Sequence, residues 1–76
     1  MFGSNVLSYA QVHSIRAGQT SSEIAALFGE PRDKRGEGAN VSLLTYAAED
    51  PDGRIRLLHI VFDENGHVSG WTLEAK

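Results

Sequence analysis

The chain is organised around the segment IRAGQTSSEIAALFGEP, residues Ile15 to Pro31. Thr20 and Glu23 stand three residues apart, the spacing of a capping box in which each side chain accepts a hydrogen bond from the other residue's backbone N–H. Three apolar residues then follow at the i, i+3, i+4 spacing of one helical face, namely Ile24, Leu27 and Phe28. The segment therefore predicts a short amphipathic helix that begins after Thr20.

The same segment contains signals for where this helix ends. Gly29 comes directly after the last apolar residue, where a left-handed C-terminal cap favours a residue without a Cβ atom. Pro31 lacks an N–H group and cannot continue the helix. On the other side, Gly18 lies in the turn that leads into the helix, and Ile15 is expected to fold back onto the apolar face.

The composition indicates one small globular domain, with 76 residues, a net charge of −3 and 41% hydrophobic residues. The chain has no cysteine, which excludes a disulfide framework and a cysteine-based zinc site. Mild acidity, without a basic face carrying aromatic residues, argues against nucleic-acid binding. No apolar run approaches the roughly 20 residues that cross a bilayer, so no transmembrane segment is expected.

The N-terminal part predicts an arm and a second, shorter helix. Residues 1–7 have no strong pattern and are expected to form a flexible arm, which leaves residues 8–76 as the single domain. Ser8 and Gln11 repeat the spacing of a weaker capping box, so a short helix is expected over Tyr9–His13. Tyr9 and Val12 are expected to face inward.

A charged connector, Arg32–Asn40, follows the main helix. Its cations raise a phosphate-binding hypothesis, but Asp33 and Glu37 lie among them, so we favour a solvated and mobile loop. Gly36-x-Gly38 is only half of a phosphate-binding fingerprint and follows no predicted strand.

Beyond the connector the pattern alternates and predicts three strands, roughly Val41–Glu49, Arg54–Asp63 and His67–Glu74. The two segments between them, residues 50–53 and 63–66, each begin with Asp and end with Gly. This composition predicts two three-residue hairpin loops, each a type I turn followed by a left-handed glycine. The expected fold class is therefore α+β, with two short N-terminal helices packed on one face of a three-stranded antiparallel meander.

These loops also predict the register of the strands. The expected opposite pairs are Tyr46 with Leu58, Leu44 with Ile60, Phe62 with Val68, and His59 with Trp71. One face, which should carry the helices, contains Leu44, Tyr46, Leu58, Ile60, Phe62 and Val68. The other contains Val41, Leu43, Leu57, His59, Val61, Trp71 and Leu73. No predicted element is left to cover this second face.

Two groups of residues in this arrangement carry a family resemblance. They are I-x-x-G-x-T-x-x-E-I-x-x-L-x-G-x-P over residues 15–31, and a strand tyrosine followed by L-x-I-x-F-D-x-x-G-x-V over residues 58–68. The combination resembles the SmpA/OmlA domain, the BamE-like domain of bacterial outer-membrane lipoproteins, over about residues 8–74. The shared structural positions include Gly18, Thr20, Glu23, Gly29, Pro31, Tyr46, Phe62 and Gly66.

The resemblance implies a fold similar to the repeat unit of β-lactamase inhibitor proteins. It also implies a non-enzymatic interaction module of the cell envelope, in contact with envelope-assembly proteins and with phospholipid head groups. The expected location is the periplasmic side of the outer membrane if a leader and a lipidated cysteine were removed, and otherwise the cytoplasm. Two departures are Leu44, where many members have an aromatic residue, and the missing cysteine.

The sequence offers little for catalysis. His59 and His67 lack a close third ligand, so they are interpreted as surface histidines rather than a metal site. Ser8, Ser21 and Ser22 stand at helix starts, where serine is favoured for capping. We therefore predict no catalytic residue, no metal and no cofactor.

The second sheet face is the predicted binding surface. It should carry Leu43, Leu57, His59, Val61 and Leu73 around the single tryptophan, Trp71. Its partner is expected to be another protein or a second copy of the chain, and an alternative function is that of a soluble inhibitor or adaptor domain. A competing expectation is that the arm, Phe2 to Leu7, folds across this face and completes the core.

Overall fold

Both predicted helices are present in the computed structural model, which describes residues 6–37 and 40–74. Helix α1 covers Tyr9–Val12 and helix α2 covers Ser21–Phe28, each with its capping box formed at Ser8 and Thr20. Gly29 ends α2 with φ of 87° and ψ of −160°, a conformation that disfavours any side chain. Both capping boxes are therefore confirmed, and Gly29 has the predicted positive φ, although its ψ places it outside the left-handed helical region that was expected.

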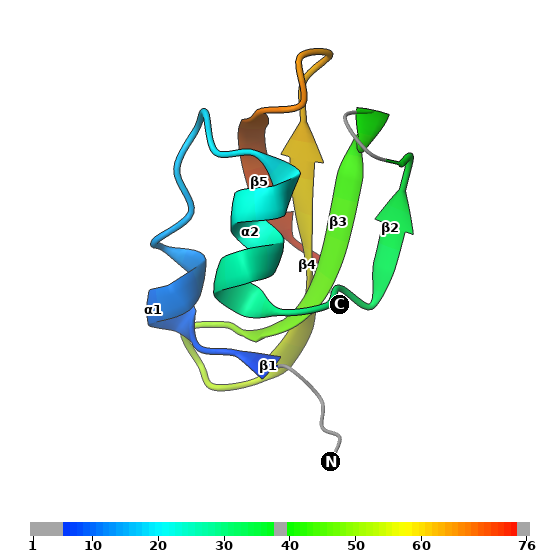
Figure 1. Cartoon of the computed structure of the whole chain (residues 1–76). Helices are drawn as coiled ribbons and strands as arrows, with labels where there is room; N and C mark the ends of the chain where they lie inside the picture. The colour runs from blue at the N-terminus through cyan, green and yellow to red at the C-terminus, as the bar shows by residue number, and fades with distance from the viewer. Residues whose placement is uncertain (1–5, 38–39, 75–76) are drawn as a thin grey trace.

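The predicted fold class is wrong in its sheet, because the described residues form five strands in a mixed sheet. The strands are β1 (Val6–Leu7), β2 (Asp33–Arg35), β3 (Leu43–Glu49), β4 (Ile55–Phe62) and β5 (Val68–Leu73). Strands β3, β4 and β5 are the three expected ones and pair antiparallel. Both helices lie on one side of this sheet (Figure 1).

The two unpredicted strands share the edge of β3 that β4 leaves free. Strand β1 pairs parallel to β3, with Val6 beside Ala47, and β2 pairs antiparallel to it, with Asp33 beside Thr45. The arm prediction is thus wrong for residues 6–7, whereas residues 1–5 lie outside the described residues. The connector prediction is likewise wrong for residues 33–35, and residues 38–39 lie outside the described part.

Sequence reasoning missed β1 and β2 because backbone hydrogen bonds, which any residue can form, hold them against β3. The Arg32 N–H donates to the Thr45 carbonyl at 2.7 Å, and the Ser42 N–H donates to the Arg35 carbonyl at 2.9 Å. All three residues of β2 are exposed, so burial imposes no alternation on its sequence. An edge strand of this kind carries no pattern that sequence reasoning can detect.

The two hairpin loops have the predicted form. In each, the glycine N–H bonds to the first aspartate's carbonyl, and Gly53 and Gly66 have φ of 82° and 81°. Each aspartate also accepts two backbone N–H groups on its Oδ1 atom, at 2.9 Å for Asp50 and at 2.9 and 3.0 Å for Asp63. Aspartate is favoured at this position because its carboxylate closes the turn.

The register confirms three predicted pairs and corrects the fourth. Tyr46 opposes Leu58, Leu44 opposes Ile60, and Phe62 opposes Val68. A β-bulge then shifts the pairing of β5, so that Trp71 opposes Ile60 and Leu73 opposes Leu58. One extra residue reverses the faces that follow it, and the predicted pair of His59 with Trp71 is therefore wrong.

The core lies between the sheet and the helices. Trp71 and Leu73 are partly buried and pack against its fully buried members. The core residues are Leu7, Val12, Ile15, Ile24, Phe28, Val41, Leu44, Tyr46, Ala48, Leu58, Ile60, Phe62 and Val68. Leu27, expected on the buried stripe, is 58% exposed, and Tyr9 is also exposed. Val41, expected on the second face, belongs to this core instead.

Candidate functional site

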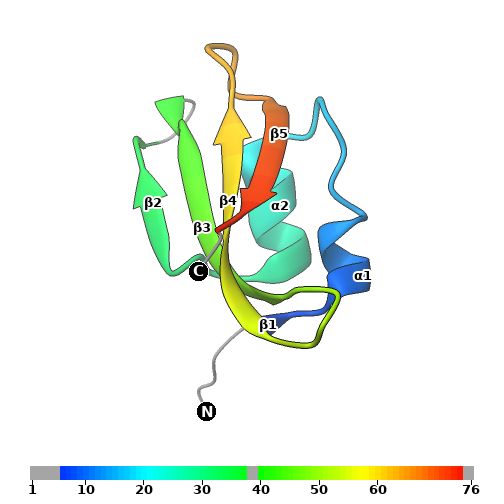
Figure 2. The ribbon, with the colours of Figure 1, turned by 180° about the vertical axis from the view of Figure 1, so that it is seen from behind.

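The face of the sheet turned away from the helices, here called the outer face, brings together four of the predicted binding residues. Leu43 opposes Val61, and Leu57 and His59 lie on the same face of β4 as Val61. Figure 2 views the sheet from this side, with α2 behind β4 and β5 and with α1 beside the strands. Among the described residues no helix covers the outer face.

The β4 part of the outer face is apolar and accessible, whereas Thr45 and Ala47 of β3 are buried. Ile55, Val61 and Leu57 are 56%, 41% and 38% exposed, and all three come from β4. Val6 of β1 is also exposed, beside Ala47. In an antiparallel sheet the solvent-facing side is commonly polar, so this composition is unusual for a surface that only meets water.

Trp71 and Leu73, the other two predicted binding residues, lie on the helix side. The Trp71 ring meets the His13 ring edge to face, with centroids 5.5 Å apart, and His13 in turn meets Tyr9 at 4.3 Å. The predicted centre of the binding surface is therefore part of the contact between β5 and α1. The bulge in β5 is the cause of this change of face.

A polar row crosses the outer face from β3 to the end of β5. His59 Nδ1 lies 3.2 Å from Thr45 Oγ1, and His59 Nε2 lies 3.3 Å from Glu74 Oε1. Sequence reasoning missed Thr45 and Glu74 as partners of His59. The predicted register already implied that Thr45 opposes His59, whereas the position of Glu74 depends on the bulge.

This row has the order of a carboxylate, a histidine and a hydroxyl, but its geometry does not suit nucleophilic catalysis. Thr45 is only 5% exposed, so its hydroxyl lies within the sheet surface and a substrate carbonyl cannot approach it. The row instead satisfies polar groups in an apolar surface. Among the described residues no group of three His, Cys, Asp or Glu side chains is placed to hold a metal.

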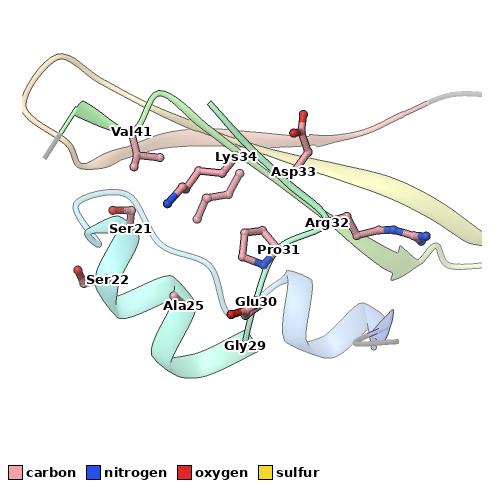
Figure 3. A pocket seen from close by; sticks show the side chains of 11 residues that line it. Ser21, Ser22, Ala25, Gly29, Glu30, Pro31, Arg32, Asp33, Lys34 and Val41 are labelled. Carbon is pink, nitrogen blue, oxygen red and sulfur yellow. The ribbon is translucent and has the colours of Figure 1, made fainter. Parts of the chain in front are cut away.

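A second candidate is an open groove of about 670 Å³ between α2 and the edge strand β2. Its floor contains Val41 and Leu44, and in Figure 3 the Lys34 side chain extends along it toward Ser21. The lining residues are Ser21, Ser22, Ala25, Gly29, Glu30, Pro31, Arg32, Asp33, Lys34, Val41 and Leu44. Its charged lining residues have both signs, so it does not select one class of ligand.

The residues that carry the family resemblance serve the fold. Thr20 and Glu23 cap α2, Gly18 donates its N–H to the Val68 carbonyl at 3.0 Å, and the Tyr46 hydroxyl donates to the Gly29 carbonyl. Pro31 follows α2, Phe62 is buried in the core, and Gly66 closes the second hairpin loop. None of these residues lies on the outer face.

Comparison with known proteins adds no relative: no family model, no curated protein and no solved structure matches the chain. The SmpA/OmlA resemblance therefore depends on the residues quoted for it. Within the described ranges, neither helix is long and apolar enough to cross a membrane.

Proposed function

We propose that this domain is a non-enzymatic protein-interaction module of the bacterial cell envelope that binds its partner through the outer face. The single observation that supports binding is the exposed apolar surface of β4, formed by Ile55, Leu57 and Val61. The assignment to the envelope is supported by the SmpA/OmlA resemblance alone.

The physical argument starts from the free energy of exposed apolar surface. Removing such surface from water contributes about 25 cal/mol per Å², so an apolar sheet face favours association with a complementary surface. Strand β4 has a paired strand on each side, so its outward side chains are held in fixed positions. A preformed surface loses little conformational entropy when it binds.

A non-enzymatic role is supported by the character of the same surface. Its polar row is internally paired, and the Thr45 hydroxyl within it is buried. The outer face thus provides complementarity and area rather than a nucleophile that a substrate can reach.

The test is affinity capture from a cell-envelope extract and from a cytosolic extract, with three forms of the domain. Leu57→Thr/Val61→Thr removes apolar area from the outer face and keeps residues that suit strands. The matched control is Leu27→Gln, which changes an exposed leucine of α2 on the other side of the sheet.

We expect the unchanged domain and Leu27→Gln to retain the same envelope protein, and the double variant to lose it while its circular dichroism spectrum stays unchanged. Equal retention by the folded double variant would refute the outer face as the binding surface. Retention of a cytosolic protein alone would favour the inhibitor or adaptor function over the envelope function.

A further inference from the structure

Acidic side chains outnumber basic ones around the outer face. Glu49 is next to Ile55 in the register, the Glu74 N–H donates to the Leu57 carbonyl at 2.8 Å, and Asp33 opposes Thr45. These three carboxylates lie on β2, at the end of β3 and just beyond β5, at the rim of the apolar surface. Among the described strands, Arg35, which lies opposite Leu43, is the one lysine or arginine on the outer face.

The alternation of the strands directs these side chains outward. Asp33 and Arg35 pair with Thr45 and Leu43, two outer-face residues, while Lys34 between them extends into the groove on the helix side (Figure 3). Glu74 is fixed on the outer face by its contact with His59, where the two side chains are 3.3 Å apart.

Two of the three rim carboxylates form no ion pair among the described residues. Among the described residues the ion pairs are Arg56 with Asp50 and His59 with Glu74, so neither Asp33 nor Glu49 is paired there. Arg56 and Asp50 do not belong to this rim. The outer face therefore combines an apolar centre with an acidic border.

We infer that the partner of the outer face is a protein surface with an apolar centre flanked by lysine or arginine. This inference depends on the proposed function and specifies its partner. Opposite charges at a rim increase the association rate and select among partners, whereas like charges across an interface are costly. The acidic border thus selects a partner with a cationic border.

The same border disfavours two other occupants. A second copy bound about a two-fold axis presents the same patch, so three carboxylates and one arginine would face an identical set. A membrane of anionic phospholipid also repels an acidic border.

The experiment uses a pair of synthetic β-hairpin peptides with the same apolar face. One peptide carries lysine at every flanking position and the other carries glutamate there. Each is titrated at low salt into the ¹⁵N-labelled domain, and the amide shifts of β3 and β4 are followed by heteronuclear NMR. We expect the lysine peptide to shift amides around Leu57 and Val61 and to bind at least about 10-fold more tightly than the glutamate peptide, or about 1.4 kcal/mol.

Variants test whether the border causes this difference. Asp33→Asn/Glu49→Gln should reduce the preference for the lysine peptide several-fold, and raised salt should reduce it in the unchanged domain. The matched control is Glu64→Gln, which removes an exposed carboxylate in a hairpin loop away from the rim and should keep the preference.

The outcomes separate this inference from the proposed function. Outer-face shifts with equal or tighter binding of the glutamate peptide would overturn the cationic partner and keep the interaction surface. Absence of outer-face shifts with both peptides would overturn both. Sedimentation showing a dimer lost in Leu57→Thr/Val61→Thr, or co-flotation with phosphatidylglycerol vesicles lost in that variant, would assign the face to a second copy or to lipid instead.

Discussion

The Tyr46 hydroxyl donates a hydrogen bond to the Gly29 carbonyl at 2.8 Å and so ties the middle of β3 to the C-terminus of α2. Tyr46 is fully buried, and its ring meets Phe28 edge to face with centroids 5.9 Å apart. The last carbonyl groups of a helix have no partner within the helix, so this bond satisfies one that the chain reversal at Gly29 leaves free.

Tyr46→Phe should therefore lower the free energy of unfolding by about 1 kcal/mol, because the hydrogen bond from the buried Tyr46 hydroxyl is lost while the packing of the ring is kept. Urea unfolding followed by circular dichroism measures this change. Tyr9→Phe, which removes the hydroxyl of an exposed tyrosine, is the matched control and should change stability little. Equal effects of the two variants would show that the bond to Gly29 does not stabilise the fold.

The same burial makes stability sensitive to alkaline pH. Burial raises the pKa of Tyr46 from 10.0 to about 12. The unfolded chain therefore loses the Tyr46 proton at lower pH than the folded chain. The contribution of the protonated Tyr46 hydroxyl to stability is complete below about pH 10 and is lost as pH rises toward 12. Urea midpoints between pH 9 and pH 12 should fall more steeply for the unchanged domain than for Tyr46→Phe. Parallel curves would contradict this assignment.

Gly29→Ala should destabilise the domain by about 1 kcal/mol or more. At φ of 87° a Cβ atom is strained, and the glycine N–H that donates to the Ala25 carbonyl at 2.8 Å fixes this conformation. Gly70→Ala is the control, because Gly70 is not among the positive-φ glycines and a Cβ atom there meets open space. Thermal unfolding of both variants tests the difference, and a Gly29→Ala domain as stable as Gly70→Ala would show that the cap tolerates a side chain.

Asp50 should stabilise the fold at neutral pH and lose this effect in acid. The Arg56 side chain, followed by the Arg54 N–H, lowers the pKa of this carboxyl below 3.8. As pH falls, the Asp50 carboxyl is protonated in the unfolded chain before it is protonated in the folded chain. The contribution of Asp50 to stability is therefore present above about pH 4 and is lost as pH falls through its folded-state pKa. In urea titrations between pH 2 and pH 5, Asp50→Asn and Arg56→Gln should both flatten this acid loss. A loss as steep as in the unchanged domain would count against the pair.

Trp71→Ala should destabilise the fold by about 2 kcal/mol, since Trp71 is partly buried against the core rather than displayed on the outer face. Leu57→Ala, on the outer face, should cost less than about 1 kcal/mol. Urea unfolding of the two variants gives the comparison. A Trp71→Ala domain of unchanged stability that loses binding of the lysine peptide would restore Trp71 to the binding surface.

Part of the candidate site could be predicted because it depends on local signals. The Asp50 loop sets the pairing of β3 with β4, and this pairing places Leu43, Leu57, His59 and Val61 on one face. The positions of Trp71 and Leu73 could not be predicted in the same way, because a single extra residue in β5 exchanges the two faces of the sheet.

What the sequence alone determined is the local structure: the caps of both helices at Ser8 and Thr20, the glycine that ends α2, and the two aspartate–glycine loops with the strands they join. These features depend on residues at most four positions apart, so each is specified wherever the segment is placed. The tertiary structure alone decided the pairing of β1 and β2 with the free edge of β3, and the bulge that turns Trp71 toward α1. Edge pairing depends on backbone groups that every residue has, and the bulge is favoured because it moves two large apolar side chains from solvent onto the core.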